Sequence, residues 1–215
     1  YYLPDPALVL PPIPEQPTQE QARESAALLQ EAIGEFPYAL DSRGGDSSRA
    51  NAVGMLVTPI VRPAIKGHIP APAIDGTQQG LGKGLLCNTA AIIATGQQAH
   101  MMNAPKNDEE MAKTLTSLLV AGKTFVILDN ITGLFDSPQL ATFLTTDTWT
   151  QRLLGGNDMV TVAQRACVFL NGNNLSLGGD LPRRCYWIRL DAKMARPWQR
   201  TGFTHTDLQG WVAER

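Results

Sequence analysis

Hydrophobic residues follow a helical period in the first part of the chain and gather in short continuous runs later. Between about Thr18 and Ile33, apolar side chains recur on one face of a helix. A polar GGDSS break follows, and residues 48–65 predict a second helix whose end we assign to Pro63. The sequence therefore predicts two helices before the first strand.

Short apolar runs and amphipathic segments alternate from residue 69 onwards. A continuous apolar run of this length is typical of a strand that is covered on both faces. The patterns predict strands at 69–75, 124–129, 166–174 and 185–191, and helices at 84–96, 108–122 and 138–146, whereas Met101 and Met102 fall in a predicted loop. This order predicts an α/β fold: a three-layer sandwich with a mainly parallel central sheet and an N-terminal helical extension.

The composition narrows the class of protein. A chain of 215 residues is long enough to bury a substantial core without disulfides or metals. Its three cysteines are widely spaced and it has only three histidines, which argues against a disulfide framework or a structural zinc site. No apolar run approaches the roughly 20 residues that a membrane helix needs. We expect a cytoplasmic protein with no membrane partner.

The first 17 residues contain six prolines, too many for a helix or a central strand. We interpret residues 1–17 as an extended arm or linker, and we expect the chain to be a piece of a longer protein. Residues 18–46 form the predicted N-terminal helical segment, and 47–215 form the main domain.

The stretch DGTQQGLGKG at 75–84 contains most of a phosphate-binding loop. It follows a predicted strand and opens a predicted helix, which is the setting that such a loop requires. Gly80 and Gly82 allow the backbone to wrap around a phosphate, and Lys83 places a positive charge against it. A glycine-rich turn that merely contains a lysine is the alternative. The predicted nucleotide-binding residues are Thr77, Gln78, Gln79, Gly80, Leu81, Gly82, Lys83, Gly84 and Leu85.

Two departures from the usual loop affect the chemistry that we expect. Thr77 replaces the first glycine, and Gly84 replaces the Ser or Thr whose hydroxyl normally coordinates Mg²⁺. The metal would then be coordinated by water, by a neighbouring polar group or by Asp129. Asp129 ends the apolar run at 124–129, which is the position of a Walker B aspartate.

The sequence does not identify the residue that would activate the attacking water. Asn130 stands where a catalytic glutamate is usual, and an amide cannot act as a base. Glu109 and Glu110 are candidates, although carboxylates at the start of a helix have an ordinary electrostatic explanation.

Two further pairs complete the candidate site. Asn173 and Asn174 end the predicted strand at 166–174, where an amide can sense the γ-phosphate or orient water, although asparagines also cap turns. Arg183 and Arg184 follow on a predicted loop. Guanidinium groups stabilise phosphoryl charge well, and a surface ion pair is the competing interpretation. The four tryptophans, Trp149, Trp187, Trp198 and Trp211, we interpret as core or interface residues.

The motifs GTQQGLGKG, VILDN, FLNGNN and GGDLPRR, in that order, resemble the AAA+ group of P-loop ATPases. The similarity is to helicase-like ATPase domains of replication proteins from phages and integrated mobile elements, and more distantly to superfamily 3 helicases. It spans roughly residues 47–212. The resemblance implies ATP and Mg²⁺ as cofactors, Asp129 as the magnesium ligand, Asn173 or Asn174 as a sensor, Arg183 or Arg184 as a finger acting in trans, and Arg196 as a second sensor.

From this resemblance we expect an ATPase that assembles into a hexameric ring and couples hydrolysis to work on single-stranded DNA. Two other functions stay open. Gly84 and Asn130 favour a nucleotide-binding switch or scaffold with little hydrolysis. The basic stretch at 183–200 would suit a DNA-binding module that uses no nucleotide.

Overall fold

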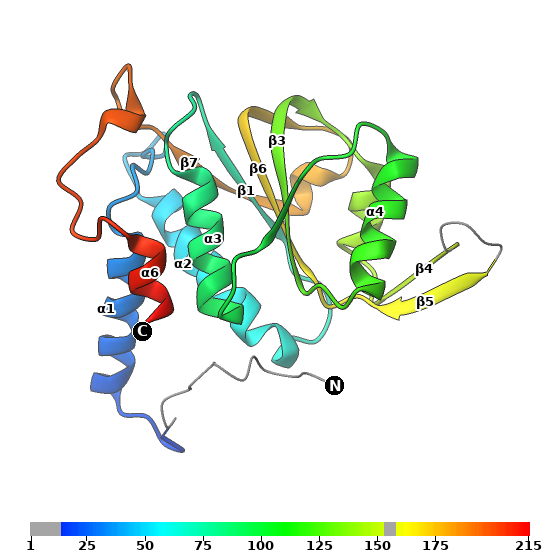
Figure 1. Ribbon diagram of the computed structural model, residues 1–215, viewed down its shortest axis with the longest axis horizontal. Coiled ribbons are helices and arrows are strands. Elements are labelled where there is room, and N and C mark those ends of the chain that lie inside the picture. The colour runs from blue at the N-terminus through cyan, green and yellow to red at the C-terminus, as the bar shows by residue number, and fades with distance from the viewer. Residues whose placement is uncertain (1–13, 153–157) are drawn as a thin grey trace.

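The computed structural model describes residues 14–152 and 158–215 (Figure 1). Residues 1–13 of the predicted proline-rich arm lie outside this part of the chain. Within it, one five-stranded sheet is sandwiched between two layers of helices, as the alternating pattern predicted. The α/β fold with a mainly parallel central sheet is confirmed.

The strands of this sheet lie in the order β2-β3-β6-β1-β7, and each neighbouring pair is parallel. Parallel neighbours bring the carboxyl ends of all five strands to one edge. In chain order they are β1 (Ala71–Gly76), β2 (His100–Asn103), β3 (Phe125–Phe135), β6 (Cys167–Leu177) and β7 (Cys185–Leu190).

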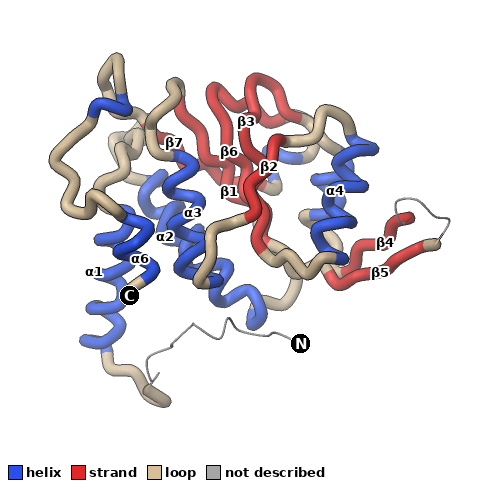
Figure 2. Tube along the Cα trace, viewed as in Figure 1, coloured by secondary structure: helices blue, strands red, loops and turns tan. Residues whose placement is uncertain are grey.

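Helices cover both faces of the sheet, as Figures 1 and 2 show. On one face Ile74 and Ile127 belong to a core with Leu86, and on the other face Ala73 and Leu128 belong to a core with α4. The first face carries α1 (Gln19–Ile33), α2 (Ser47–Val61), α3 (Lys83–Thr95) and α6 (Leu208–Ala213), and the second carries α4 (Asp108–Val120) and α5 (Pro138–Phe143).

Polar residues fix where the helices begin. Thr18 accepts a hydrogen bond from the amide of Gln21, whose side chain accepts one from the Thr18 amide. The side chains of Asn107 and Ser137 accept from the amides of Glu110 and Leu140 and so cap α4 and α5. Each cap satisfies an amide that a helix leaves unpaired at its start. The predicted start of the first helix at Thr18 is therefore within one residue of the observed one.

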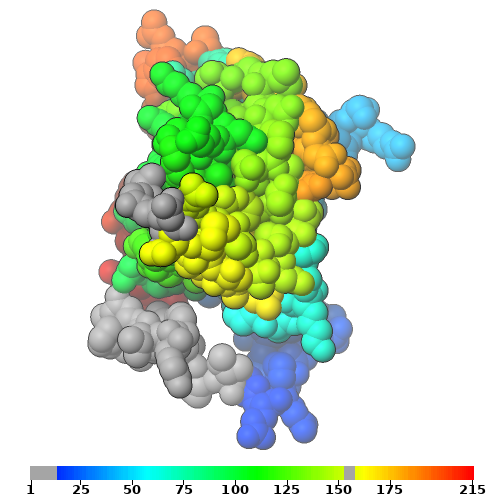
Figure 3. Space-filling view, turned by 90° about the vertical axis from the view of Figure 1, so that its right-hand side faces the viewer, coloured from blue at the N-terminus to red at the C-terminus, as the bar shows by residue number. Residues whose placement is uncertain are grey.

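Three strands and one α-helix were not predicted. Met101 and Met102, expected in a loop, lie in edge strand β2. Strands β4 (Thr148–Arg152) and β5 (Met159–Ala163) form a separate antiparallel hairpin between α5 and β6, and α6 follows near the end of the chain. Figure 3 shows the hairpin (yellow) beside the surface of α4.

Trp149 attaches this hairpin to the main domain. Its indole Nε1 donates to Thr116 Oγ1 at 2.9 Å, and its ring meets Phe143 edge-on at 5.1 Å between centroids. Because both partners are buried, the hairpin base is part of the second core. None of the described helices has the length and apolar character needed to cross a membrane.

Candidate functional site

The glycine loop, which we define as residues 76–82, joins the carboxyl end of β1 to the first turn of α3. Gly80 and Gly82 have φ angles of +78° and +89°, a backbone conformation that other residues adopt only with strain. A Cβ on Gly80 would also lie 3.0 Å from the Cβ of Trp198. The predicted strand-loop-helix setting is thus present, with glycines where the backbone requires them.

Lys83 is the first residue of α3 and is only 7 % exposed. Its Nζ donates to the backbone oxygen of Gln78 at 3.0 Å and to Asn173 Oδ1 at 2.7 Å. Burial lowers the pKa of Lys83, and the nearby carboxylates of Asp75 and Asp129 oppose that change. A buried cation at the N-terminus of a helix is an arrangement that attracts an anion.

Asp129 lies on β3 beside this lysine and is held by a residue that we did not predict. Asn171 Nδ2 donates to Asp129 Oδ1 at 2.7 Å. The two are neighbours because Leu128 of β3 pairs with Leu170 of β6. Asn171 is 4 % exposed, and its buried Oδ1 has no hydrogen-bond partner among the described residues. Its position directly after the apolar run CVFL was the available signal.

The structure separates the two asparagines that were predicted as sensors. Asn173 contacts Lys83, so strands β1 and β6 and helix α3 converge on one point. Asn174 is exposed, has a φ of +50°, and is not among the residues that hydrogen-bond to Lys83 or Asp129 in the described chain. Asn173 is therefore the better placed of the two.

The candidates for water activation lie elsewhere. Glu109 and Glu110 pair with Lys113 at 2.8 and 2.9 Å on an exposed face of α4. Asn130 is exposed, and its Nδ2 donates to Asn103 Oδ1 at 2.7 Å. Within the described residues, the hydrogen bonds of these side chains do not include Lys83 or Asp129. The assignment of Glu110 as a base stays a prediction that the geometry does not favour.

Arg183 and Arg184 have different environments. Arg183 is 67 % exposed and forms a two-pronged ion pair with Asp180, at 3.1 Å from Nε and 2.6 Å from Nη2. Arg184 is 14 % exposed and donates to the Ala141 carbonyl, to Thr145 and to Asp180. Arg184 therefore fastens the chain to α5, whereas the Arg183 guanidinium is accessible.

Both arginines precede β7, whose first residue pairs with the first residue of β1. The glycine loop follows the last residue of β1. The arginines and the loop of one chain therefore lie toward opposite edges of the sheet.

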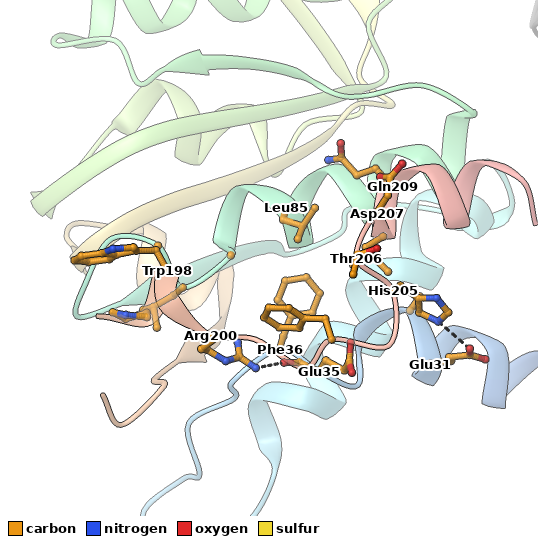
Figure 4. Close-up of a pocket in the computed structure, with 17 residues that line it drawn as sticks. Glu31, Glu35, Phe36, Leu85, Trp198, Arg200, His205, Thr206, Asp207 and Gln209 are labelled. Atoms are coloured by element: carbon orange, nitrogen blue, oxygen red, sulfur yellow. Dashed lines mark hydrogen bonds and ion pairs between the residues drawn. The ribbon is translucent and has the colours of Figure 1, made fainter. Parts of the chain in front are cut away.

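A cavity of about 330 Å³ lies beside the glycine loop. Its walls come from the C-terminal end of α1, from the loop and first turn of α3, and from the segment 197–209 (Figure 4). Phe36, Leu85 and Trp198 supply apolar surface. Trp198 is 62 % exposed and its side chain lies over Gly80 at the surface, so of the predicted core or interface role the core is excluded.

Hydrogen bonds fasten the segment 197–209 to α1 and the turn after it. Glu35 accepts from Arg200 Nη2 through its backbone oxygen at 2.6 Å and from the Thr204 amide through its carboxylate at 2.9 Å. His205 Nε2 lies 2.9 Å from Glu31 Oε1, and its ring stacks on Trp211 at 4.0 Å. The N-terminal helical extension therefore takes part in forming the cavity wall.

Comparisons with known proteins identify a shared fold. No protein-family model and no curated protein matches the chain. Among solved structures, the A-form apo structure of the NrS-1 C-terminal region is similar, with a TM-score of 0.54 and 18% sequence identity. The match covers 99% of this chain and 45% of that one, so the chain spans less than half of the length of that structure. At this identity the likeness concerns the fold alone.

Proposed function

We propose that the chain binds ATP at the glycine loop and hydrolyses it, as the AAA+ ATPase module of a DNA replication or helicase-type motor from a phage or mobile element. One observation carries the proposal: Lys83, at the start of α3, meets Asn173 from β6 beside the Asp129–Asn171 pair, at the carboxyl edge of a parallel sheet. Ligands of open α/β folds bind at this edge.

The residues present fit a triphosphate. Gly80 and Gly82 give the loop the positive φ angles that allow its backbone amides to wrap around a phosphate, and a Cβ at either position would crowd Trp198 or Phe36. Lys83 would exchange its hydrogen bonds to Gln78 and Asn173 for phosphate oxygens, which hydrogen-bond to a cation more strongly than neutral acceptors do.

A magnesium ion fits beside the phosphates, with Asp129 as its protein carboxylate. Mg²⁺ commonly takes one or two carboxylates and completes its shell with water and substrate phosphates. The buried, unpartnered Oδ1 of Asn171 lies next to Asp129 and would accept a hydrogen bond from such a water. When bound, the metal neutralises charge on the phosphates.

The cavity beside the loop suits the nucleobase. It opens next to the residues that would hold the phosphates, and Trp198 offers an exposed aromatic face at its entrance. Phe36 and Leu85 supply the apolar surface that a base buries. Phosphate and base would therefore be held by adjacent parts of one site.

The position of Arg183 supports assembly into a ring, for which a hexamer is our expectation. Its exposed guanidinium lies toward the edge of the sheet opposite the glycine loop, so it would stabilise phosphoryl charge only in a neighbouring subunit. Hydrolysis and assembly would then be linked, and single-stranded DNA would be the partner that moves through or along the assembly.

A second function, a nucleotide-binding switch with little hydrolysis, is favoured by Asn130. Its amide is hydrogen-bonded to Asn103, where a carboxylate would be needed to activate water. The same glycine loop and cavity would serve both functions, and the two differ only in turnover.

The test is ATP hydrolysis measured at rising protein concentration, with and without single-stranded DNA. The proposal predicts that the rate per chain rises with concentration and with DNA, and that Arg183→Ala removes the rise. Arg43→Ala, at an exposed arginine before α2, is the matched control and should behave like the unaltered protein. A background rate in all conditions, with ATP bound, would select the switch.

A further inference from the structure

We infer that the cavity beside the glycine loop selects poorly among nucleobases, so that the site accepts nucleoside triphosphates as a class and binds ATP and GTP with affinities within about tenfold of each other. The inference rests on the proposed function. It follows from the hydrogen bonds that the polar side chains around the cavity form within the protein.

Discrimination between bases requires polar groups that face the edge of the base. Adenine and guanine differ in the donors and acceptors on that edge, and a site that hydrogen-bonds one pattern leaves groups unpaired with the other. An apolar cavity recognises the flat faces, which all bases share.

Four charged or titratable side chains in the wall hydrogen-bond within the protein: Glu31, Glu35, Arg200 and His205. The Glu35 carboxylate accepts from both the amide and the hydroxyl of Thr204. Arg200 donates to the Glu35 backbone oxygen and lies over the Phe203 ring at 5.1 Å. Glu31 and His205 are paired with each other. Among the described residues, the Nε and Nη1 groups of Arg200 have no protein acceptor. They can only donate, and both adenine and guanine offer an acceptor at N7, so these groups can bind either purine.

The remaining polar side chains lie at the end of the cavity away from Trp198, as Figure 4 shows. Asp207 accepts from the Gly210 amide as the cap of α6, and the side-chain oxygen of Gln209 accepts from Gln98 Nε2. Thr206 offers a hydroxyl, and the Gln209 amide and the Trp198 indole offer N–H donors that either purine can meet at N7. One hydroxyl distinguishes bases weakly, because it can either donate or accept.

The surface left for a base is therefore aromatic and aliphatic. Trp198 stands over Gly80, next to the loop, and its exposed face is available for stacking. Stacking depends on ring area, so purines should bind more tightly than pyrimidines, and adenine about as tightly as guanine.

The experiment is titration calorimetry of the intact chain with Mg²⁺ and the slowly hydrolysed analogues ATPγS and GTPγS, followed by CTP, UTP and inorganic tripolyphosphate. We expect the first two dissociation constants to agree within tenfold. Trp198→Ala should weaken ATPγS and GTPγS by a similar factor, weaken CTP and UTP by less, and leave tripolyphosphate unchanged. Val120→Ala, at an exposed apolar residue ending α4, is the control and should change none of them.

The outcomes separate the two claims. If none of the nucleotides nor tripolyphosphate binds, the proposed function fails. If ATPγS binds and GTPγS is weaker by more than tenfold, nucleotide binding stands and the inference on selectivity is overturned. The same holds if Trp198→Ala weakens one purine nucleotide far more than the other, since a shared stacking surface cannot produce that result.

Discussion

The side-chain oxygen of Asn173 lies 2.7 Å from Lys83 Nζ, so an amide on β6 occupies a hydrogen-bonding position of the buried lysine. A γ-phosphate would need that position. The same amide would then be released beside the phosphate, where it can orient a water molecule. Binding and hydrolysis should therefore respond differently to its removal.

We predict that Asn173→Ala keeps or tightens ATP binding, by up to about tenfold, because one competing hydrogen bond is lost. Turnover should fall by more than about tenfold, as expected when a polar group at the reacting phosphate is removed. Calorimetry with ATPγS and a phosphate-release assay measure the two effects. Asn174→Gly, which tolerates the positive φ at that position, should alter neither. Equal losses of binding and turnover in Asn173→Ala would contradict this role.

Nucleotide affinity should depend on pH through Lys83. Burial lowers the pKa of its ammonium group from the ordinary value of 10.5, and bound phosphates would raise it again. The charged form is complete below the lowered pKa and is lost above it, so affinity should be constant at lower pH and then fall, by up to about tenfold per pH unit. Dissociation constants measured between about pH 7 and 10 test this.

Lys83→Arg is the control for the pH dependence, because a guanidinium stays charged over the same range. Its affinity is expected to be lower throughout, since the fork does not match the position of an ammonium, but flat with pH. A decline of equal steepness in Lys83→Arg would show that another group is responsible.

Gly84 leaves room for the hydroxyl that the loop lacks. A Cβ at this position would meet only the Met101 Cε within 4 Å, at 3.7 Å, which is an ordinary contact. We predict that Gly84→Ser folds normally and binds Mg²⁺-ATP more tightly, by about three- to tenfold, because the hydroxyl adds a metal ligand. Gly84→Ala adds the carbon without the oxygen and should show no gain. The magnesium concentration for half-maximal binding is the measurement.

Substitutions of Arg183 and Arg184 should affect different properties: Arg184 should matter for stability and Arg183 for turnover. Arg184→Ala removes hydrogen bonds to the Ala141 carbonyl and Thr145 from a mostly buried side chain, so it should lower the free energy of unfolding by about 1–3 kcal/mol. Arg183→Ala should leave the melting temperature unchanged and reduce turnover in the assembled state. Thermal melts and concentration-dependent ATPase assays measure the two effects. A lower melting temperature in Arg183→Ala, with reduced turnover only in a stable Arg184→Ala, would contradict this assignment.

The sequence indicated the sheet and the glycine loop because both are encoded locally. The runs that became β1, β3, β6 and β7 are continuous and apolar, as strands covered on both faces require. Edge strand β2 was missed because His100–Asn103 is short and polar at both ends. The β4–β5 hairpin was missed because its alternation is brief and its stabilising contact, Trp149 with Thr116, is distant in sequence.

The candidate site was predictable in part for the same reason. Lys83 begins a recognisable helix and Asp129 ends a recognisable apolar run, although strand β3 continues to Phe135. Choosing among Asn171, Asn173 and Asn174 depends on how β3 and β6 pair. The cavity was beyond prediction, because Trp198 and Glu35 lie far apart in the chain and meet the loop only through tertiary packing.

The central claim is that Lys83 and the glycine loop bind a triphosphate. The most direct measurement is calorimetric titration of ATPγS into the unaltered chain, Lys83→Met and Lys123→Met, with thermal melts to confirm folding. Lys123 is an exposed lysine in the turn after α4 and serves as the matched control. The account predicts binding that Lys83→Met weakens by more than about 100-fold while Lys123→Met leaves it unchanged. Equal affinity in a folded Lys83→Met variant would contradict it.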